Sequence, residues 1–268
     1  MTPQDTYTHG HHPTVLRSHS WRTAENSAGY LLAHIAAGQR ILDVGCGPGT
    51  ITLDLAERVG SGQVVGIDNA ADVIATAESN RVERGLGNVA FAVGDVYALD
   101  FDDDSFGIVH AHQVLQHLSD PVAALREMRR VCRPGGLVAI RDSDYAGFVW
   151  APLDQRLDRW MALYHDLAHG NRAEPDAGRF LLHWAQAAGF SDIQPSASVW
   201  CFATPADREW WGNTWAERVT MSAFATQAIE RGLATEAELA DLAEGWRSWV
   251  AAPDGWFTVL HGEVLCRP

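Results

Sequence analysis

Short apolar runs alternate with amphipathic stretches between residues 40 and 142. Five runs rich in Val, Ile and Ala are typical of strands buried on both faces of a sheet, and they cover residues 40–45, 62–68, 88–95, 106–112 and 135–142. The stretches between them have the spacing of helices and cover residues 50–60, 71–87 and 120–133. This alternation predicts a doubly wound, mostly parallel α/β sheet with right-handed crossovers.

The flanking segments predict further helices and two more strands. An amphipathic helix is expected over residues 20–37, beginning at Ser20 or Thr23. Later helices are expected over 153–169, 176–189 and 206–249. Strands are expected over 191–205, an edge strand interrupted by Pro195, and over 256–266, which makes seven strands. Because ten of the eleven Trp residues stand at or after Trp150, we divide the chain into an N-terminal lid and helix (1–37), an α/β core (38–145), and a helical, Trp-rich cap with the final strands (146–268).

The composition of the chain excludes some classes of enzyme chemistry and disfavours some partners. The chain has 268 residues, a net charge of −14 and no lysine, so Schiff-base and P-loop lysine chemistry are excluded. An acidic surface disfavours nucleic acid and anionic membranes as partners and favours a small molecule. The four cysteines are too far apart for a zinc motif or a disulfide framework. No long apolar run or secretory signal is visible, so we expect a cytoplasmic protein. The oligomeric state stays open, with a homodimer as one option.

The sequence ILDVGCGPGT, residues 41–50, joins the first predicted strand to the first helix. Glycine at 45, 47 and 49 permits a tight turn and lets a ligand approach the backbone. Dehydrogenases use G-x-G-x-x-G to seat a pyrophosphate. Here Thr50 stands at the last position of that pattern, and Asp43 stands two residues before the first glycine. This arrangement favours a ligand without a pyrophosphate.

Acidic residues also end the second and third predicted strands. Asp68 is placed to accept the two hydroxyls of a ribose, as such an acid does in open α/β sheets. Asp95 is placed to accept from an adenine amino group, although a helix cap is an equally good interpretation of this residue. Together with the glycine loop, these acids predict an adenosine ligand with a short charged tail. The acidic run at 100–104 is interpreted as a solvated loop and not as a metal site.

These motifs resemble the class I S-adenosylmethionine-dependent methyltransferases, particularly those similar to ubiquinone- and menaquinone-biosynthesis methyltransferases. The resemblance covers residues 20–145, including FGIVHAHQVLQHLSDPVAALREMRRVCRPGG, and departs at Gly107, where the family usually has Asp. It implies a Rossmann-like methyltransferase fold and S-adenosylmethionine as cofactor, with S-adenosylhomocysteine as product and no metal. The cofactor-binding residues that it implies are Asp43, Gly45, Cys46, Gly47, Asp68, Asn69, Gly94, Asp95, Val96, His112 and Gln113.

The resemblance also implies methyl transfer to a small acceptor. We expect a planar or apolar molecule of indole-, quinone- or polyketide-like type, methylated on carbon, nitrogen or oxygen. We also expect the reaction to belong to specialised metabolism. Two other classes stay open: an NAD-dependent oxidoreductase, disfavoured by the missing third-position glycine, and a non-catalytic protein that binds S-adenosylmethionine.

Catalytic and acceptor-binding residues are less clearly indicated. Tyr7, His12 and His117 are the candidates for methyl-transfer catalysis, with a polar tail or a structural role as the alternative. An acceptor pocket is expected from Trp21, Asp144, Tyr145 and Trp150, the last three near or beyond the end of the fifth strand. The later Trp residues form either the core of the cap or an aromatic wall for the acceptor; they include Trp150, Trp160, Trp184, Trp200, Trp210, Trp211 and Trp215.

Overall fold

The computed structural model describes residues 21–268, and a single eight-stranded sheet runs through them in the order β3-β2-β1-β4-β5-β8-β6, with β7 paired to the other side of β8. β1 to β5 are parallel, and β8 is antiparallel to β5, β6 and β7. The strands are β1 (Arg40–Val44), β2 (Gln63–Asp68), β3 (Val89–Val93), β4 (Phe106–His112), β5 (Cys132–Ser143), β6 (Val149–Ala151), β7 (Asp192–Phe202) and β8 (Trp256–Arg267).

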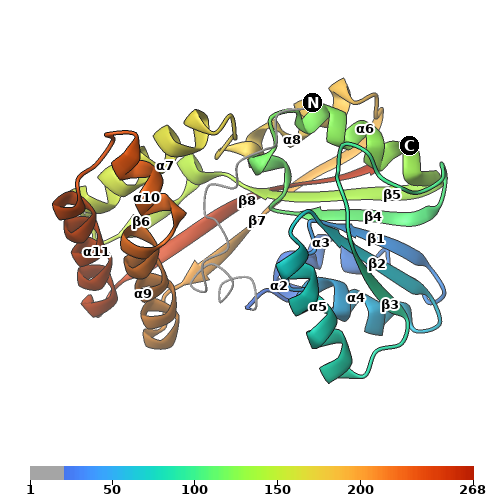
Figure 1. Cartoon of the computed structure of the whole chain (residues 1–268), viewed down its shortest axis with the longest axis horizontal. Coiled ribbons are helices and arrows are strands. Elements are labelled where there is room, and N and C mark those ends of the chain that lie inside the picture. The colour runs from blue at the N-terminus through green and yellow to red at the C-terminus, as the bar shows by residue number, and fades with distance from the viewer. Residues whose placement is uncertain (1–20) are drawn as a thin grey trace.

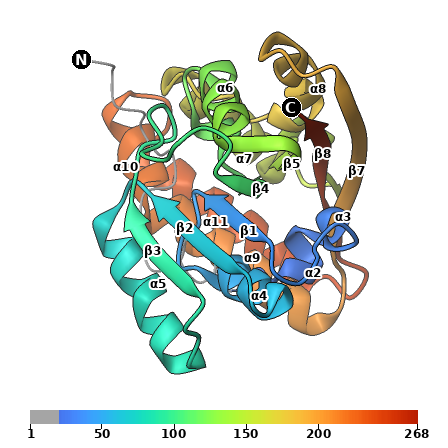
Figure 2. The same ribbon diagram turned by 90° about the vertical axis from the view of Figure 1, so that its right-hand side faces the viewer.

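Helices cover both faces of the sheet (Figure 2). One face is covered by α2 (Ala24–Ser27), α3 (Gly29–Leu32), α4 (Thr50–Val59) and α5 (Ala71–Arg84). The other is covered by α6 (Pro121–Val131) and α8 (Ala177–Ala187). Each face has its own apolar core, with Leu31, Ile41 and Leu55 in one and Leu42, Phe106 and Met128 in the other. This is the predicted doubly wound α/β fold.

The remaining long helices form a cap at one end of the sheet (Figure 1). They are α7 (Gln155–Gly170), α9 (Pro205–Met221), α10 (Ala223–Glu230) and α11 (Glu236–Ala251). Their shared core is aromatic: Trp160, Trp215, Trp246 and Trp249 are almost fully buried there, and Phe257 of β8 packs among them. Because β8 extends from this core into the sheet, the cap and the α/β core share one continuous strand.

Four expectations about the elements were wrong in detail. The helix expected over 20–37 is two short helices, with Thr23 as the cap of α2 and a break at Ala28, whose φ of −131° is not helical. The helix expected over 206–249 is three, because Ser222 and Thr235 each begin a new helix with a side-chain cap. The seven-stranded sheet has an eighth strand, β6, whose three residues were too few to show alternation. Pro195 does not interrupt β7, since it lies in an edge strand.

Candidate active site

The loop from β1 to α4 is built from glycines in a left-handed conformation. Gly45, Gly47 and Gly49 have φ values of +67°, +56° and +80°. Residues other than glycine rarely adopt such values. A Cβ on Gly45 would also clash with Cγ2 of Val114, and one on Gly49 would lie 2.6 Å from the Phe91 ring. The loop therefore brings bare backbone to the start of α4, where unpaired helix N–H groups gather.

Asp43 supports this loop through contacts with β4 and α4. Its carboxylate lies 2.7 Å from Nδ1 of His110 on β4 and accepts a 2.6 Å hydrogen bond from the Thr52 hydroxyl on α4. The side chain is almost fully buried. Asp43 thereby fixes the first strand, the fourth strand and the first helix of the core relative to one another.

Asp68 ends β2 and links two backbone segments around the same space. One carboxylate oxygen accepts from Gly47 N–H at 3.1 Å and the other from Ala70 N–H at 3.1 Å. Asp95, beyond β3, accepts from Tyr97 N–H at 2.9 Å and is exposed. The predicted acids at the strand ends thus converge on the glycine loop, as the topology of a parallel sheet requires.

A cavity of about 990 Å³ opens at this edge of the sheet. One part, here called the glycine-loop half, is lined by the ends of β1 to β4 and includes Asp43, Gly45, Cys46, Gly47, Asp68, Asn69, Gly94, Asp95, Val96, His112 and Gln113. The other part, the aromatic half, includes Trp21, Arg22, Tyr145, Phe148, Trp200, Trp210, Trp211, Trp215, Arg218 and Val259. A volume of this size is at the upper end of the range for small-molecule sites.

A chain of hydrogen bonds fixes the residue between the two halves. Gln113 has a φ of +54°, and its backbone N–H donates to Arg141 O at 2.7 Å. Its side-chain oxygen accepts from Arg22, and its amide nitrogen lies 2.9 Å from Nε2 of His261. Nδ1 of His261 lies 3.1 Å from Val259 O, so it carries the proton, and Nε2 is free to accept. Hydrogen bonds therefore hold both the oxygen and the nitrogen of the Gln113 side-chain amide.

Two buried histidines in this region are neutral. Burial lowers the pKa values of His112 and His261 well below the usual value, and the charges of Arg22 and Arg141 lower them further. Arg141 is itself buried, which lowers its pKa to about 10, and it stays charged beside Glu263 at 3.2 Å. The positive charge of Arg141 is therefore balanced within the protein.

Comparison with known proteins agrees with this geometry. Residues 35–216 match the family model described as a methyltransferase domain, which is more than half of the chain. The chain belongs to the S-adenosylmethionine-dependent methyltransferases. It is 35% identical to an uncharacterized methyltransferase of Schizosaccharomyces pombe, over 99% of this chain and 98% of that protein. It is 30% identical to the probable methyltransferase ltbC of Aspergillus luteorubrus, over 97% and 96% of the two chains.

A solved structure shows the same fold. Phosphoethanolamine N-methyltransferase 2 of Haemonchus contortus, determined with phosphomonomethylethanolamine and S-adenosylhomocysteine, matches with a TM-score of 0.56 at 23% identity. The match covers 87% of this chain and 50% of that protein. At this identity the likeness concerns the fold alone.

The glycine-loop half of the cavity fits S-adenosylmethionine. The bare glycine backbone lets a ligand approach the loop closely, and the Asp68 carboxylate, which accepts from Gly47 N–H, lines the same space. Every one of the eleven residues predicted to bind the cofactor lines the cavity. Asp43 lines it too, but both of its oxygens are engaged with His110 and Thr52, so its role there is support of the loop.

Only some of the residues predicted for catalysis or acceptor binding line the cavity. His117, Trp21 and Tyr145 line the cavity, whereas Asp144 and Trp150 do not. Tyr7 and His12 lie outside the described residues, as does most of the predicted lid. Trp150 stacks against Phe257 in the cap core at a centroid distance of 5.8 Å. The expectation that Trp150 and Asp144 face the acceptor is therefore wrong.

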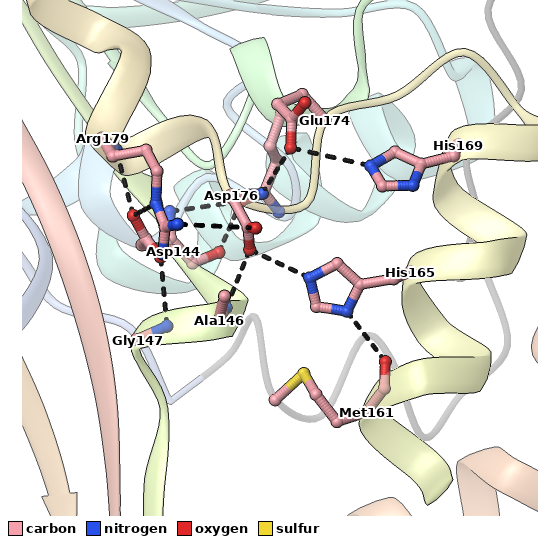
Figure 3. A network of polar contacts seen from close by, with 11 residues as sticks. Asp144, Ala146, Gly147, Met161, His165, His169, Glu174, Asp176 and Arg179 are labelled. Carbon is pink, nitrogen blue, oxygen red and sulfur yellow. Dashed lines mark hydrogen bonds and ion pairs between the residues drawn. The ribbon is translucent and has the colours of Figure 1, made fainter. Parts of the chain in front are cut away.

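Asp144 has a structural role instead (Figure 3). Its carboxylate accepts from the guanidinium of Arg179 at 2.7 and 2.5 Å, from the backbone N–H of Arg179 at 3.2 Å and from Gly147 N–H at 3.1 Å. The neighbouring Asp176 accepts from Ala146 N–H at 2.8 Å and lies 3.0 Å from Nε2 of His165. This network ties the turn after β5 to α7 and α8, and both oxygens of Asp144 are used in it.

Four of the later Trp residues form an aromatic wall, namely Trp200, Trp210, Trp211 and Trp215. Trp21 packs against two of them, with ring centroids 5.1 Å from both Trp200 and Trp210. Trp160 and Trp184 lie away from the cavity. Sequence reasoning missed Arg22 and Arg218 as lining residues, although Trp211, Trp215 and Arg218 repeat at the spacing of one helix face.

Within residues 21–268, no cluster of three or more His, Cys, Asp or Glu side chains is arranged to hold a metal ion. Among the same residues, every helix is too short or too polar to cross a bilayer.

Proposed function

We propose that this methyltransferase acts on a small, planar, largely apolar acceptor that lies in the aromatic half of the cavity. The observation that carries the proposal is the wall of Trp21, Trp200, Trp210, Trp211 and Trp215 in the same cavity as the glycine loop. Rigid indole rings offer a large contact area at little cost in conformational entropy. A planar acceptor gains most from such a wall.

When bound, S-adenosylmethionine supplies a methyl group that is already activated for displacement. The residues of this chain then have to hold the two reactants in line and exclude water. The clamped Gln113, between the two halves, and the glycine loop position the cofactor side, while the Trp wall positions the acceptor. Alignment of this kind needs no dedicated base unless the acceptor must lose a proton.

His117 is the described candidate for taking such a proton, but its Nε2 is engaged. The Gln116 side-chain oxygen accepts from Ser143 N–H at 3.2 Å, which fixes the orientation of the amide. The Gln116 amide nitrogen therefore faces Nε2 of His117 at 3.0 Å and donates to it. Proton acceptance at that nitrogen would require this bond to break. A cytoplasmic location and a role in specialised metabolism stay predictions from the sequence.

The test combines cofactor binding with a screen of acceptors. Thermal shift with S-adenosylhomocysteine and NAD distinguishes the cofactor, since only a ligand of the folded state raises the melting temperature. Methyl transfer is then measured with planar and non-planar acceptors of equal size. We expect turnover of planar acceptors, and a raised KM in Trp210→Ala with unchanged S-adenosylhomocysteine affinity.

Trp184→Ala is the matched control. Trp184 is half-buried like Trp210, but it lies on α8 outside the cavity, so KM should not change. Turnover of non-planar acceptors only, or equal effects of the two substitutions, would refute the proposed acceptor class. Binding of S-adenosylhomocysteine without any methyl transfer would instead favour a non-catalytic binding protein.

A further inference from the structure

The order of the strands indicates which part of S-adenosylmethionine reaches β4. This part of the sheet runs β3-β2-β1-β4. The acids that we expect to bind the nucleoside are Asp95, just beyond β3, and Asp68, at the end of β2. With the nucleoside there, the amino-acid end of the cofactor extends over the glycine loop after β1 toward the end of β4. Gln113 follows β4 and lines the cavity at that point.

Gln113 is held in a conformation that its neighbours must maintain. Its φ of +54° is uncommon for a residue other than glycine, and such strain is often found at functional sites. Its amide has four hydrogen-bonding positions, of which Arg22 and His261 use one each. The other two, one N–H and one oxygen lone pair, suit a cofactor tail that carries a carboxylate and an ammonium group. Gln113 is thus placed to bind this tail.

Arg22 and His261 together admit only one orientation of the Gln113 amide. Arg22 can only donate, so the amide oxygen must face it. The amide nitrogen then faces Nε2 of His261 at 2.9 Å. A half-turn of the amide would place donor against donor at Arg22 and acceptor against acceptor at His261. The amide therefore presents a defined donor and a defined acceptor to the cavity.

His261 is itself fixed by the protein. Its Nδ1 donates to Val259 O at 3.1 Å, and burial lowers the pKa of the ring well below its usual value, so Nε2 is an acceptor. The side chain is fully buried on β8, and its ring packs against that of Trp200 with the two centroids 4.4 Å apart. A chain of hydrogen bonds therefore runs from the backbone of β8 through His261 to Gln113.

We propose that His261 is a positioning residue for the cofactor, which accepts from the Gln113 amide and so holds that amide toward the amino-acid end of S-adenosylmethionine. His261 acts through Gln113 and not by contact, because it is fully buried and is not among the described residues that line the cavity. The inference concerns the cofactor side of the cavity and does not depend on the acceptor class proposed above.

The test compares two ligands that share the nucleoside and differ at the amino-acid end, S-adenosylhomocysteine and methylthioadenosine. Affinities are measured by calorimetry with the full chain. His261→Phe keeps an aromatic ring against Trp200 but removes the acceptor. We expect this variant to raise the Kd of S-adenosylhomocysteine about tenfold, the scale of one hydrogen bond to a charged group, and to leave that of methylthioadenosine unchanged. A merely structural role of His261 would weaken both ligands alike.

Further variants assign the effect to the contact with Gln113. His261→Gln supplies a side-chain oxygen that can accept from Gln113, so it should restore part of the affinity. Gln113→Met keeps an unbranched side chain but loses both hydrogen bonds. Adding His261→Phe to it should cause no further loss, because the two residues act through one contact. Thr258→Val is the matched control, since Thr258 is buried on β8 but does not line the cavity, and both affinities should stay at the wild-type values.

Equal losses for the two ligands in His261→Phe, or additive losses in the double variant, overturn the inference. A further measurement requires no variant to fold: NMR of the wild-type protein with isotope-labelled imidazole rings should show His261 neutral with its proton on Nδ1. A proton on Nε2 overturns the inference, as does a wild type that binds S-adenosylhomocysteine no more tightly than methylthioadenosine. None of these measurements includes a methyl acceptor, so failure here is distinguishable from failure of the proposed function.

Discussion

Replacement of Asp68 by Ala tests the cofactor site most directly. The substitution removes a carboxylate that lines the cavity and that also accepts from the amides of Gly47 and Ala70, each at 3.1 Å. It therefore acts in two ways: it removes the carboxylate that we expect to accept from the ribose hydroxyls, and it releases the glycine loop from the end of β2.

The expected loss follows from these contacts. A hydrogen bond to a charged group contributes about 1.5–3 kcal/mol when its loss leaves the partner unsatisfied. Water entering the open cavity can replace part of what the Gly47 amide loses, so the separate contributions do not add in full. We therefore expect a total loss of about 1.5–3 kcal/mol in binding, which is a rise of about 10- to 150-fold in Kd.

Calorimetric titration with S-adenosylhomocysteine measures this change, and circular dichroism checks that the sheet stays folded. Asp68→Asn is the matched control, because it keeps one acceptor oxygen but places an NH2 group against one of the two backbone amides. Its Kd should fall between those of the wild type and Asp68→Ala. Equal Kd values for all three proteins would refute the assignment of Asp68 to the cofactor site.

Three further substitutions test the loop, a buried acid and a structural network. Gly47→Val should abolish S-adenosylhomocysteine binding while the sheet stays folded, since a φ of +56° strains a branched residue that would also occupy ligand space; normal calorimetric binding would make the loop an ordinary turn. Burial raises the pKa of Asp142 to about 7, so the stability due to its bound proton is present at low pH and is lost as the pH rises from about 4 to 7. The melting temperature of Asp142→Asn should therefore rise relative to the wild type between about pH 4 and pH 7, and a constant difference would contradict this. Asp144→Ala should lower the free energy of unfolding by about 1–3 kcal/mol, because the Gly147 and Arg179 amides lose a buried acceptor; denaturant titration measures it, and unchanged stability with impaired acceptor binding would restore Asp144 to the site.

The sequence alone determined the α/β core and its cofactor edge. Periodicity located β1 to β5 because strands buried on both faces are continuous apolar runs. The glycine loop, Asp68 and Asp95 could be placed together because parallel strands end at one edge of a sheet, so their order along the chain dictates their convergence. Local sequence was sufficient there, since each residue needed only to be assigned to a strand end.

Only the tertiary structure decided which residues line the aromatic half of the cavity. Trp150 and Trp200 both stand near strand ends, yet Trp150 packs in the cap core and Trp200 lines the cavity. Asp144 has the position of a site residue in the sequence, but Arg179, 35 positions later, engages it. Arg22 and Arg218 reach one cavity from opposite ends of the chain. Which face of each element is buried depends on segments distant in sequence, and packing between them is set only when the cap folds onto the sheet.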